Sequence, residues 1–154
     1  MFNLKTLELE ALDMPDAPPG HQFSGRSITE DVGAKLTGIG VYELPPGQSG
    51  WPYHYELGDE EWAIVIEGEV TLRSPSGERT LRAGDVVCFP PGPDGAHLFR
   101  NDSDETVRFA MPSTVSQGVD VVIYPDSNKV KISGPGVRKR IALGEEVGYW
   151  EGEP

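Results

Sequence analysis

Residues 52–68 indicate the fold of this chain most clearly, and they run PYHYELGDEEWAIVIEG. His54 and Glu56 are two residues apart, so on a β-strand both side chains point to the same face. Glu61 then opens an apolar run. A further polar candidate, His97, lies downstream in residues 90–101, which read PPGPDGAHLFRN. Two imidazoles and two carboxylates on a β framework suit a divalent first-row metal ion, so the pattern predicts a buried metal site.

The rest of the chain is organised as short apolar runs separated by turn residues. Turn sequences such as Pro-Pro-Gly at 45–47 and Ala-Gly-Asp at 83–85 separate these runs. No stretch shows the long 3.6-residue apolar period of an amphipathic helix. The many short apolar runs therefore predict strands, in an all-β sandwich or small barrel. Residues 7–12 fit either a short strand or a helical turn. The predicted strands cover residues 36–44, 53–56, 61–66, 70–73, 78–82, 85–89, 96–101, 106–111 and 119–124.

Length and composition fit a single domain with a real core, because the chain has 154 residues. We expect one domain over 1–154, with its core at about 34–125 and a C-terminal tail at 129–154. The formal net charge of −12 disfavours nucleic acid and anionic membranes as partners, since both would repel the protein. No apolar run approaches the roughly 20 residues that span a bilayer, and the first residues show no secretory signal. Cys88 is the single cysteine, which excludes an intramolecular disulfide and fits a cytoplasmic location.

The C-terminal tail is polar and rich in glycine. Because Gly-Pro-Gly at 134–136 interrupts its charges, we expect a loop with solvated charges rather than a binding patch. Val147, Tyr149 and Trp150 should tether the tail to the body or to a partner subunit. The basic residues of the tail are five of the thirteen in the chain: Lys129, Lys131, Arg138, Lys139 and Arg140.

Two stretches together resemble the signature motifs of the cupin superfamily of small β-barrels. The first family motif runs Gly, five residues, His-x-His, three or four residues, Glu, six residues, Gly; the second runs Gly, five residues, Pro-x-Gly, two residues, His, three residues, Asn. This chain matches the first with Gly47, His54-Tyr55-Glu56, Glu61 and Gly68, and the second with Gly84, Pro90-Pro91-Gly92, His97 and Asn101. Residues 120–126 also look like the end of single-domain bacterial cupins of unassigned function. The resemblance implies an all-β cupin-type barrel, or jelly roll, that forms a homodimer.

The chain departs from the family pattern at one ligand position, where Glu56 stands in place of the second histidine. A gap one residue longer before His54 and a loop two residues longer before His97 are minor changes. The resemblance then implies a divalent ion (Zn, Mn, Fe or Ni) held by His54, Glu56, Glu61 and His97. Glu61 is preferred to Glu60 because it keeps the six-residue spacing to the following glycine. The alternatives are that the change to Glu56 marks a site without tight metal binding, and that His97 is a core histidine satisfied by the backbone.

Three classes of function remain open for such a site. One is a metal-dependent enzyme acting on a small organic molecule, such as an oxygenase or an isomerase. Another is a non-enzymatic binding module for a sugar or carboxylate, and a third is a structural cupin without chemistry. No catalytic group is evident beyond the ligands, with Glu43 the nearest candidate, while Trp51 is the aromatic residue best placed to line a pocket. With ordinary histidine pKa values of about 6.5, metal affinity should fall steeply below roughly pH 6.

Overall fold

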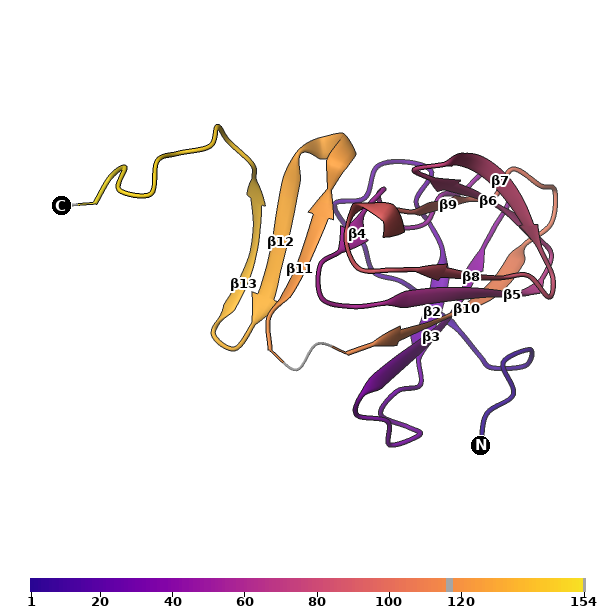
Figure 1. Cartoon of the computed structure of the whole chain (residues 1–154). Coiled ribbons are helices and arrows are strands. Elements are labelled where there is room, and N and C mark those ends of the chain that lie inside the picture. Colours follow the sequence, from indigo (N-terminus) through magenta and orange to yellow (C-terminus); the bar gives the residue numbers. More distant parts are fainter. Residues whose placement is uncertain (116–117, 154) are drawn as a thin grey trace.

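The computed structural model describes residues 1–115 and 118–153, and nearly all of their regular structure is β (Figure 1). Every predicted strand is present with shifted ends, so the all-β prediction is confirmed. Two short 3₁₀ turns, η1 (Pro93–Gly95) and η2 (Pro125–Ser127), accompany the strands. The strands are β1 (Glu10–Ala11), β2 (Ser24–Ser27), β3 (Thr37–Leu44), β4 (Tyr55–Glu56), β5 (Glu61–Glu67), β6 (Glu69–Ser74), β7 (Gly77–Arg82), β8 (Val86–Phe89), β9 (Leu98–Arg100), β10 (Val107–Thr114), β11 (Asp120–Tyr124), β12 (Lys129–Gly134) and β13 (Val137–Ala142).

The strands form three antiparallel sheets, and two of them pack face to face as a jelly roll. The larger sheet has the order β1-β2-β3-β10-β5-β8, and β7-β6-β9 lies across from it (Figure 1). Alternate residues of facing strands fill the space between, as the period of two along a strand requires. Val65, Leu72 and Phe109 are all almost completely buried in this core. The predicted metal ligands His54, Glu61 and His97 lie at one open end of this body.

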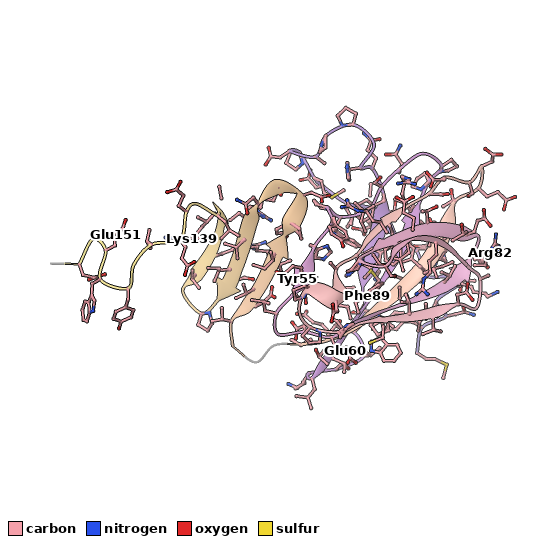
Figure 2. The ribbon with its side chains drawn as sticks, turned by 45° about the horizontal axis from the view of Figure 1, so that its top comes forward. Tyr55, Glu60, Arg82, Phe89, Lys139 and Glu151 are labelled. Carbon is pink, nitrogen blue, oxygen red and sulfur yellow. The ribbon has the colours of Figure 1, made fainter. Side chains whose placement is uncertain are left out.

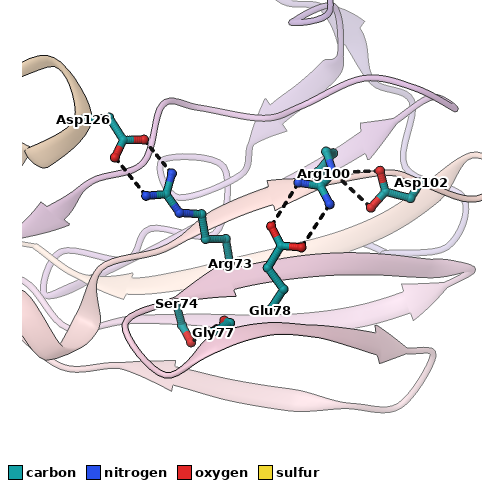
Figure 3. A network of polar contacts seen from close by, with 7 residues as sticks. All are labelled: Arg73, Ser74, Gly77, Glu78, Arg100, Asp102 and Asp126. Carbon is teal, nitrogen blue, oxygen red and sulfur yellow. Dashed lines mark hydrogen bonds and ion pairs between the residues drawn. The ribbon is translucent and has the colours of Figure 1, made fainter.

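The third sheet, in the order β13-β12-β11-β4, stands beside the jelly roll (Figure 1). It is joined to the body through β4, whose Tyr55 and Glu56 pair with Ile123 and Val122 of β11. The sheet is also tied to β6, where Arg73 donates two hydrogen bonds, of 2.6 and 2.9 Å, to Asp126 in η2 (Figure 3). These contacts set β11 and β12 against the open end of the jelly roll.

The predicted loop over the basic part of the tail is wrong, because residues 129–142 form the β12–β13 hairpin. Gly134 pairs with Val137, and Pro135 and Gly136 make the turn between them. Gly136 has φ 75°, which a glycine adopts without strain, so the Gly-Pro-Gly sequence is a hairpin turn and not a break in structure. Val130 and Ile132 alternate with lysines, which is the period expected of a strand.

The last residues do not pack on the body, contrary to one of the two tethering roles predicted for them. Val147, Tyr149 and Trp150 are 63%, 88% and 76% exposed. Figure 2 shows Glu151, in the same segment, well away from the jelly roll. Packing across a partner subunit stays a prediction. No helix in the described ranges has the length and apolar character needed to cross a membrane.

Candidate metal centre

Three of the four predicted ligands lie together at the open end of the jelly roll. Glu61 Oε2 is 3.6 Å from His97 Nε2 and 4.0 Å from His54 Nε2. One ligand atom from each residue lies within 4.8 Å of the others. His54 and His97 are far apart in sequence, but their backbones exchange two hydrogen bonds, of 3.2 and 2.9 Å. Glu61 is the first residue of β5, so the three side chains come from three strand ends that meet at one place.

The backbone fixes the same tautomer in both histidines. His54 Nδ1 is 2.8 Å from the Pro52 carbonyl oxygen, and His97 Nδ1 is 2.9 Å from that of Gly95. A carbonyl oxygen only accepts, so each Nδ1 carries the proton and each Nε2 presents a lone pair. In metal-binding histidines the second ring nitrogen makes just this kind of hydrogen bond. Both rings are therefore oriented as ligands.

His97 Nε2 shows that the centre fits a metal ion. It is buried and has no hydrogen-bond partner among the described residues. A buried polar atom without a partner is costly, so a core histidine satisfied by the backbone would leave this nitrogen unexplained. Phe89 stacks on the ring at 3.9 Å between centroids and holds its plane. A divalent ion between the three side chains would give Nε2 a partner.

Burial keeps both histidines neutral at physiological pH. It lowers the pKa of His97 to about 3, with a further contribution from the neighbouring His54, and it also lowers the pKa of His54. The same burial, with the charges of Asp59 and Asp120, raises the pKa of Glu61 to about 7. Neutral imidazoles are the form that binds a metal ion, while Glu61 must lose its proton first.

Glu56, the fourth predicted ligand, lies on the same cavity but groups with other carboxylates. Its carboxylate oxygen lies within 4.8 Å of those of Asp59 and Asp120 rather than with the histidine pair. Desolvation, followed by the charges of Glu61, Asp120 and Asp59, raises the pKa of Glu56 to about 8. The alternation of His54 and Glu56 thus brings both to one cavity, with Glu56 farther along the strand. Its coordination of the ion stays a prediction.

These residues open into a cavity of about 300 Å³ between the jelly roll and the third sheet. Trp51 is part of its wall, as the sequence predicted, and packs edge-to-face against Tyr42 at 4.7 Å. A Cβ at Gly40 would collide with the Tyr42 hydroxyl, so that glycine leaves room for the ring. The wall is formed by Ser27, Thr29, Gly38, Ile39, Gly40, Tyr42, Trp51, His54, Glu56, Glu61, Met111, Ser113, Val122, Tyr124 and Lys131.

Sequence reasoning missed the contribution of the third sheet to this wall. Lys131 on β12 lines the cavity and forms an ion pair of 3.0 Å with Asp120. Tyr124 on β11 stacks on His54 at 5.8 Å. The signal was the alternation Asp120-Val122-Tyr124, which places these side chains on one face of a strand. Lys131 was missed because its strand was predicted to be a loop.

Three other residues, Glu43, Asn101 and Cys88, do not line the cavity. Glu43 forms a 2.8 Å ion pair with Arg108, which also donates to the carbonyl oxygens of Leu4 and Leu7 and so fastens the N-terminal segment. Asn101 is fully buried and donates to the carbonyl oxygens of Leu44 and Glu105, which makes it a turn residue. Cys88 lies on β8, and burial raises the pKa of its thiol, as expected of an unreactive cysteine.

Comparison with known proteins agrees with this geometry. Residues 40–115, which contain His54, Glu61 and His97, match the family model of the cupin domain. No curated protein matches the chain. Among solved structures, a protein from Acidithiobacillus ferrooxidans whose assignment as a sugar phosphate isomerase is provisional is 26% identical, with a TM-score of 0.79 over 90% of this chain and 87% of its own.

Two further solved structures share the fold at lower identity. A sugar phosphate isomerase of the cupin superfamily from Silicibacter pomeroyi is 22% identical, with a TM-score of 0.81 over 97% of each chain. The polyketide cyclase RemF from Streptomyces resistomycificus is 21% identical, with a TM-score of 0.61 over 75% of this chain and 79% of its own. The same jelly roll therefore underlies all of these chains.

Proposed function

The chain belongs to the cupin superfamily, and on that basis we propose that it is a metal-dependent enzyme that converts a small, oxygen-rich organic molecule. His54, Glu61 and His97 hold the ion in this proposal. The observation that carries it is the buried Nε2 of His97, which lacks a partner and lies 3.6 Å from Glu61 beside a second histidine of the same tautomer.

Two imidazoles and one carboxylate suit Zn, Mn, Fe(II) or Ni. When bound there, a divalent ion supplies Lewis acidity toward an oxygen of the bound molecule. Three protein ligands leave coordination positions open, which is the usual difference between a catalytic and a structural site. A cavity of about 300 Å³ matches a small molecule of sugar-like size.

Glu56 is the residue of the cavity best suited to move a proton. In the metal-free protein its pKa is raised to about 8, and a carboxyl whose pKa lies near the working pH can both donate and accept a proton. Lys131 on the same wall is held by its ion pair with Asp120 and can orient polar groups of the ligand. An acid–base group beside a Lewis acid is what an isomerisation of an oxygenated molecule requires. The provisional assignment of the 26% identical relative supports this class.

The test is metal analysis of protein purified without an affinity tag. About one ion per chain is expected, and His97→Ala should lose it. His21→Asn is the matched control, because His21 donates to the Gly50 carbonyl oxygen and is not part of the cavity wall. Metal-free protein that takes up none of the four ions would contradict the proposal. Stoichiometric metal with ligand binding but no turnover would favour a binding module.

A further inference from the structure

The C-terminal segment, residues 143–153, leaves the body without packing against it. Leu143 is fixed to Asn128 by hydrogen bonds of 2.8 and 3.0 Å. Beyond that point, the described backbone hydrogen bonds of the segment run from Glu151 to Gly148 and from Glu153 to Trp150, at 3.0 and 3.2 Å. Figures 1 and 2 show the segment extending away from the third sheet.

This segment carries the most exposed aromatic side chains of the described residues. Tyr149 and Trp150 are 88% and 76% exposed and touch each other edge-to-face at 4.9 Å. Val147 beside them is 63% exposed. Large aromatic side chains bury roughly 150–250 Å² each when covered, so they are typical anchors of protein interfaces.

β13 is the outermost strand of the third sheet, and no described strand pairs with its outer edge. Arg138, Lys139 and Arg140 on this strand are all exposed. Arg138 and Arg140 lie on one face of the strand and Lys139 on the other, so β13 is basic on both faces in a chain whose net charge is −12. An unpaired strand edge can accept an extended segment from another chain.

Charge decides which segment fits this edge. Two β13 strands paired across a two-fold axis would bring their basic side chains against each other, which is unfavourable. The C-terminal segment has the opposite sign, with Glu145, Glu146, Glu151 and Glu153. A copy's own segment continues directly from β13 and runs away from it (Figure 1), so the complementary segment is that of a second copy.

We propose that two copies of this chain associate by reciprocal docking, with the C-terminal segment of each lying along β13 of the other. The acidic residues of the segment face the basic strand, and Tyr149 and Trp150 are buried in the contact. Each copy gives and receives the same segment, so the assembly closes as a two-fold dimer. The third sheet also carries Lys131 and Tyr124 of the cavity wall, so docking would steady that wall.

Sedimentation velocity of the full chain tests this inference independently of metal binding. A dimer is expected at micromolar concentration, with weaker association at high salt. Tyr149→Ser combined with Trp150→Ser should weaken dimerisation by about 100-fold or more, as expected for interface anchors. Leu36→Ser is the matched control, since Leu36 is 71% exposed and lies elsewhere.

Charge reversal provides a second, specific readout. Arg138→Glu with Arg140→Glu should dissociate the dimer, and adding Glu145→Lys with Glu146→Lys should restore it. A full-length chain that remains monomeric at about 100 µM would overturn the proposal. So would a dimer that survives loss of both aromatic side chains, or a charge-reversed chain that is not rescued. Circular dichroism and metal content of each variant separate these outcomes from a folding defect or a failed metal centre.

Discussion

At the scale of single residues, the candidate centre depends on which nitrogen of each histidine carries the proton. The Pro52 and Gly95 carbonyl oxygens hold it on Nδ1 and turn both Nε2 atoms toward Glu61. Sequence spacing predicted that these residues meet, but spacing carries no information about tautomers. Spacing also could not predict that Glu56 groups with Asp59 and Asp120 rather than with the histidines, because this depends on where the two-residue strand β4 ends.

Glu61 and Glu56 are expected to affect metal binding differently. Glu61→Gln should lower the affinity for Zn by the order of 100-fold or more, because it removes a ligand. Glu56→Gln should lower it by less than about tenfold and reduce turnover or ligand binding instead, as expected for a neighbour of the ion. Competition titration with a chromophoric chelator measures both. Equal losses of metal affinity in the two variants would indicate that Glu56 is itself a ligand.

The pH dependence of metal binding should follow Glu61 rather than His97. The folded metal-free protein holds a proton on Glu61 below pH 7, while the pKa of about 3 keeps His97 neutral there and burial lowers the pKa of His54. Affinity should therefore fall by about tenfold per pH unit as the pH drops below 7, because Glu61 must lose its proton when the ion binds. The decline should begin near pH 7, above the pH of roughly 6 that ordinary histidine pKa values imply. Zn titrations between about pH 5.5 and 7 measure it, and an affinity that does not change with pH over this range would contradict this account.

The same pKa shift predicts how Glu61→Gln changes the stability of the metal-free protein. Folding raises the pKa of Glu61 from 4.5 to about 7, so its ionisation opposes folding as the pH rises through that window. Glu61→Gln removes this cost and should stabilise the metal-free protein by about 1–3 kcal/mol at pH 8. Below about pH 4 the effect should be close to zero, because the wild-type carboxyl is then protonated in both the folded and the unfolded chain. Urea unfolding in the presence of a chelator measures the difference, and a pH-independent effect would show that the Glu61 carboxyl is not desolvated.

At the scale of secondary structure, alternation and turn chemistry predicted the strands of the jelly roll. The apolar run of β5, the apolar alternation of β6 and the Ser-Pro-Ser-Gly turn at 74–77 are local features, so one sequence suffices to identify them. The β12–β13 hairpin was missed because Gly-Pro-Gly serves equally as a loop and as a hairpin turn. The predicted cavity wall was then incomplete, since Lys131 and Tyr124 come from the third sheet, which pairs with β4 through β11.

The hairpin turn can be tested by one substitution. Gly136→Ala should destabilise the β12–β13 hairpin by about 1 kcal/mol, because residue 136 has φ 75° and a side chain is strained there. Gly144→Ala is the matched control, since Gly144 has open space around its Cα and no positive φ. Hydrogen exchange of the β12 amides reports the change directly. Equal protection in the two variants would contradict the turn assigned here.

At the scale of the whole molecule, a bound metal ion should stabilise the folded jelly roll. His54, Glu61 and His97 come from three separate segments that meet only in the folded chain. An unfolded chain therefore does not offer the ion the same three ligands. Metal at about 1,000 times its Kd should therefore add roughly 4 kcal/mol to the free energy of unfolding. His97→Ala should abolish this increment. Calorimetry with and without metal is the measurement, and stabilisation that persists in His97→Ala would indicate binding at another place.

The central claim is that two histidines and one carboxylate hold a divalent ion, and X-ray absorption of the Zn-loaded, untagged protein tests it most directly. The account predicts two imidazole ligands and carboxylate oxygen at about 2.0–2.2 Å from the metal, and His97→Ala, which should not retain the ion, should show no such imidazole signal. A spectrum with only oxygen ligands would contradict it. So would an imidazole signal that is the same in wild type and in His97→Ala.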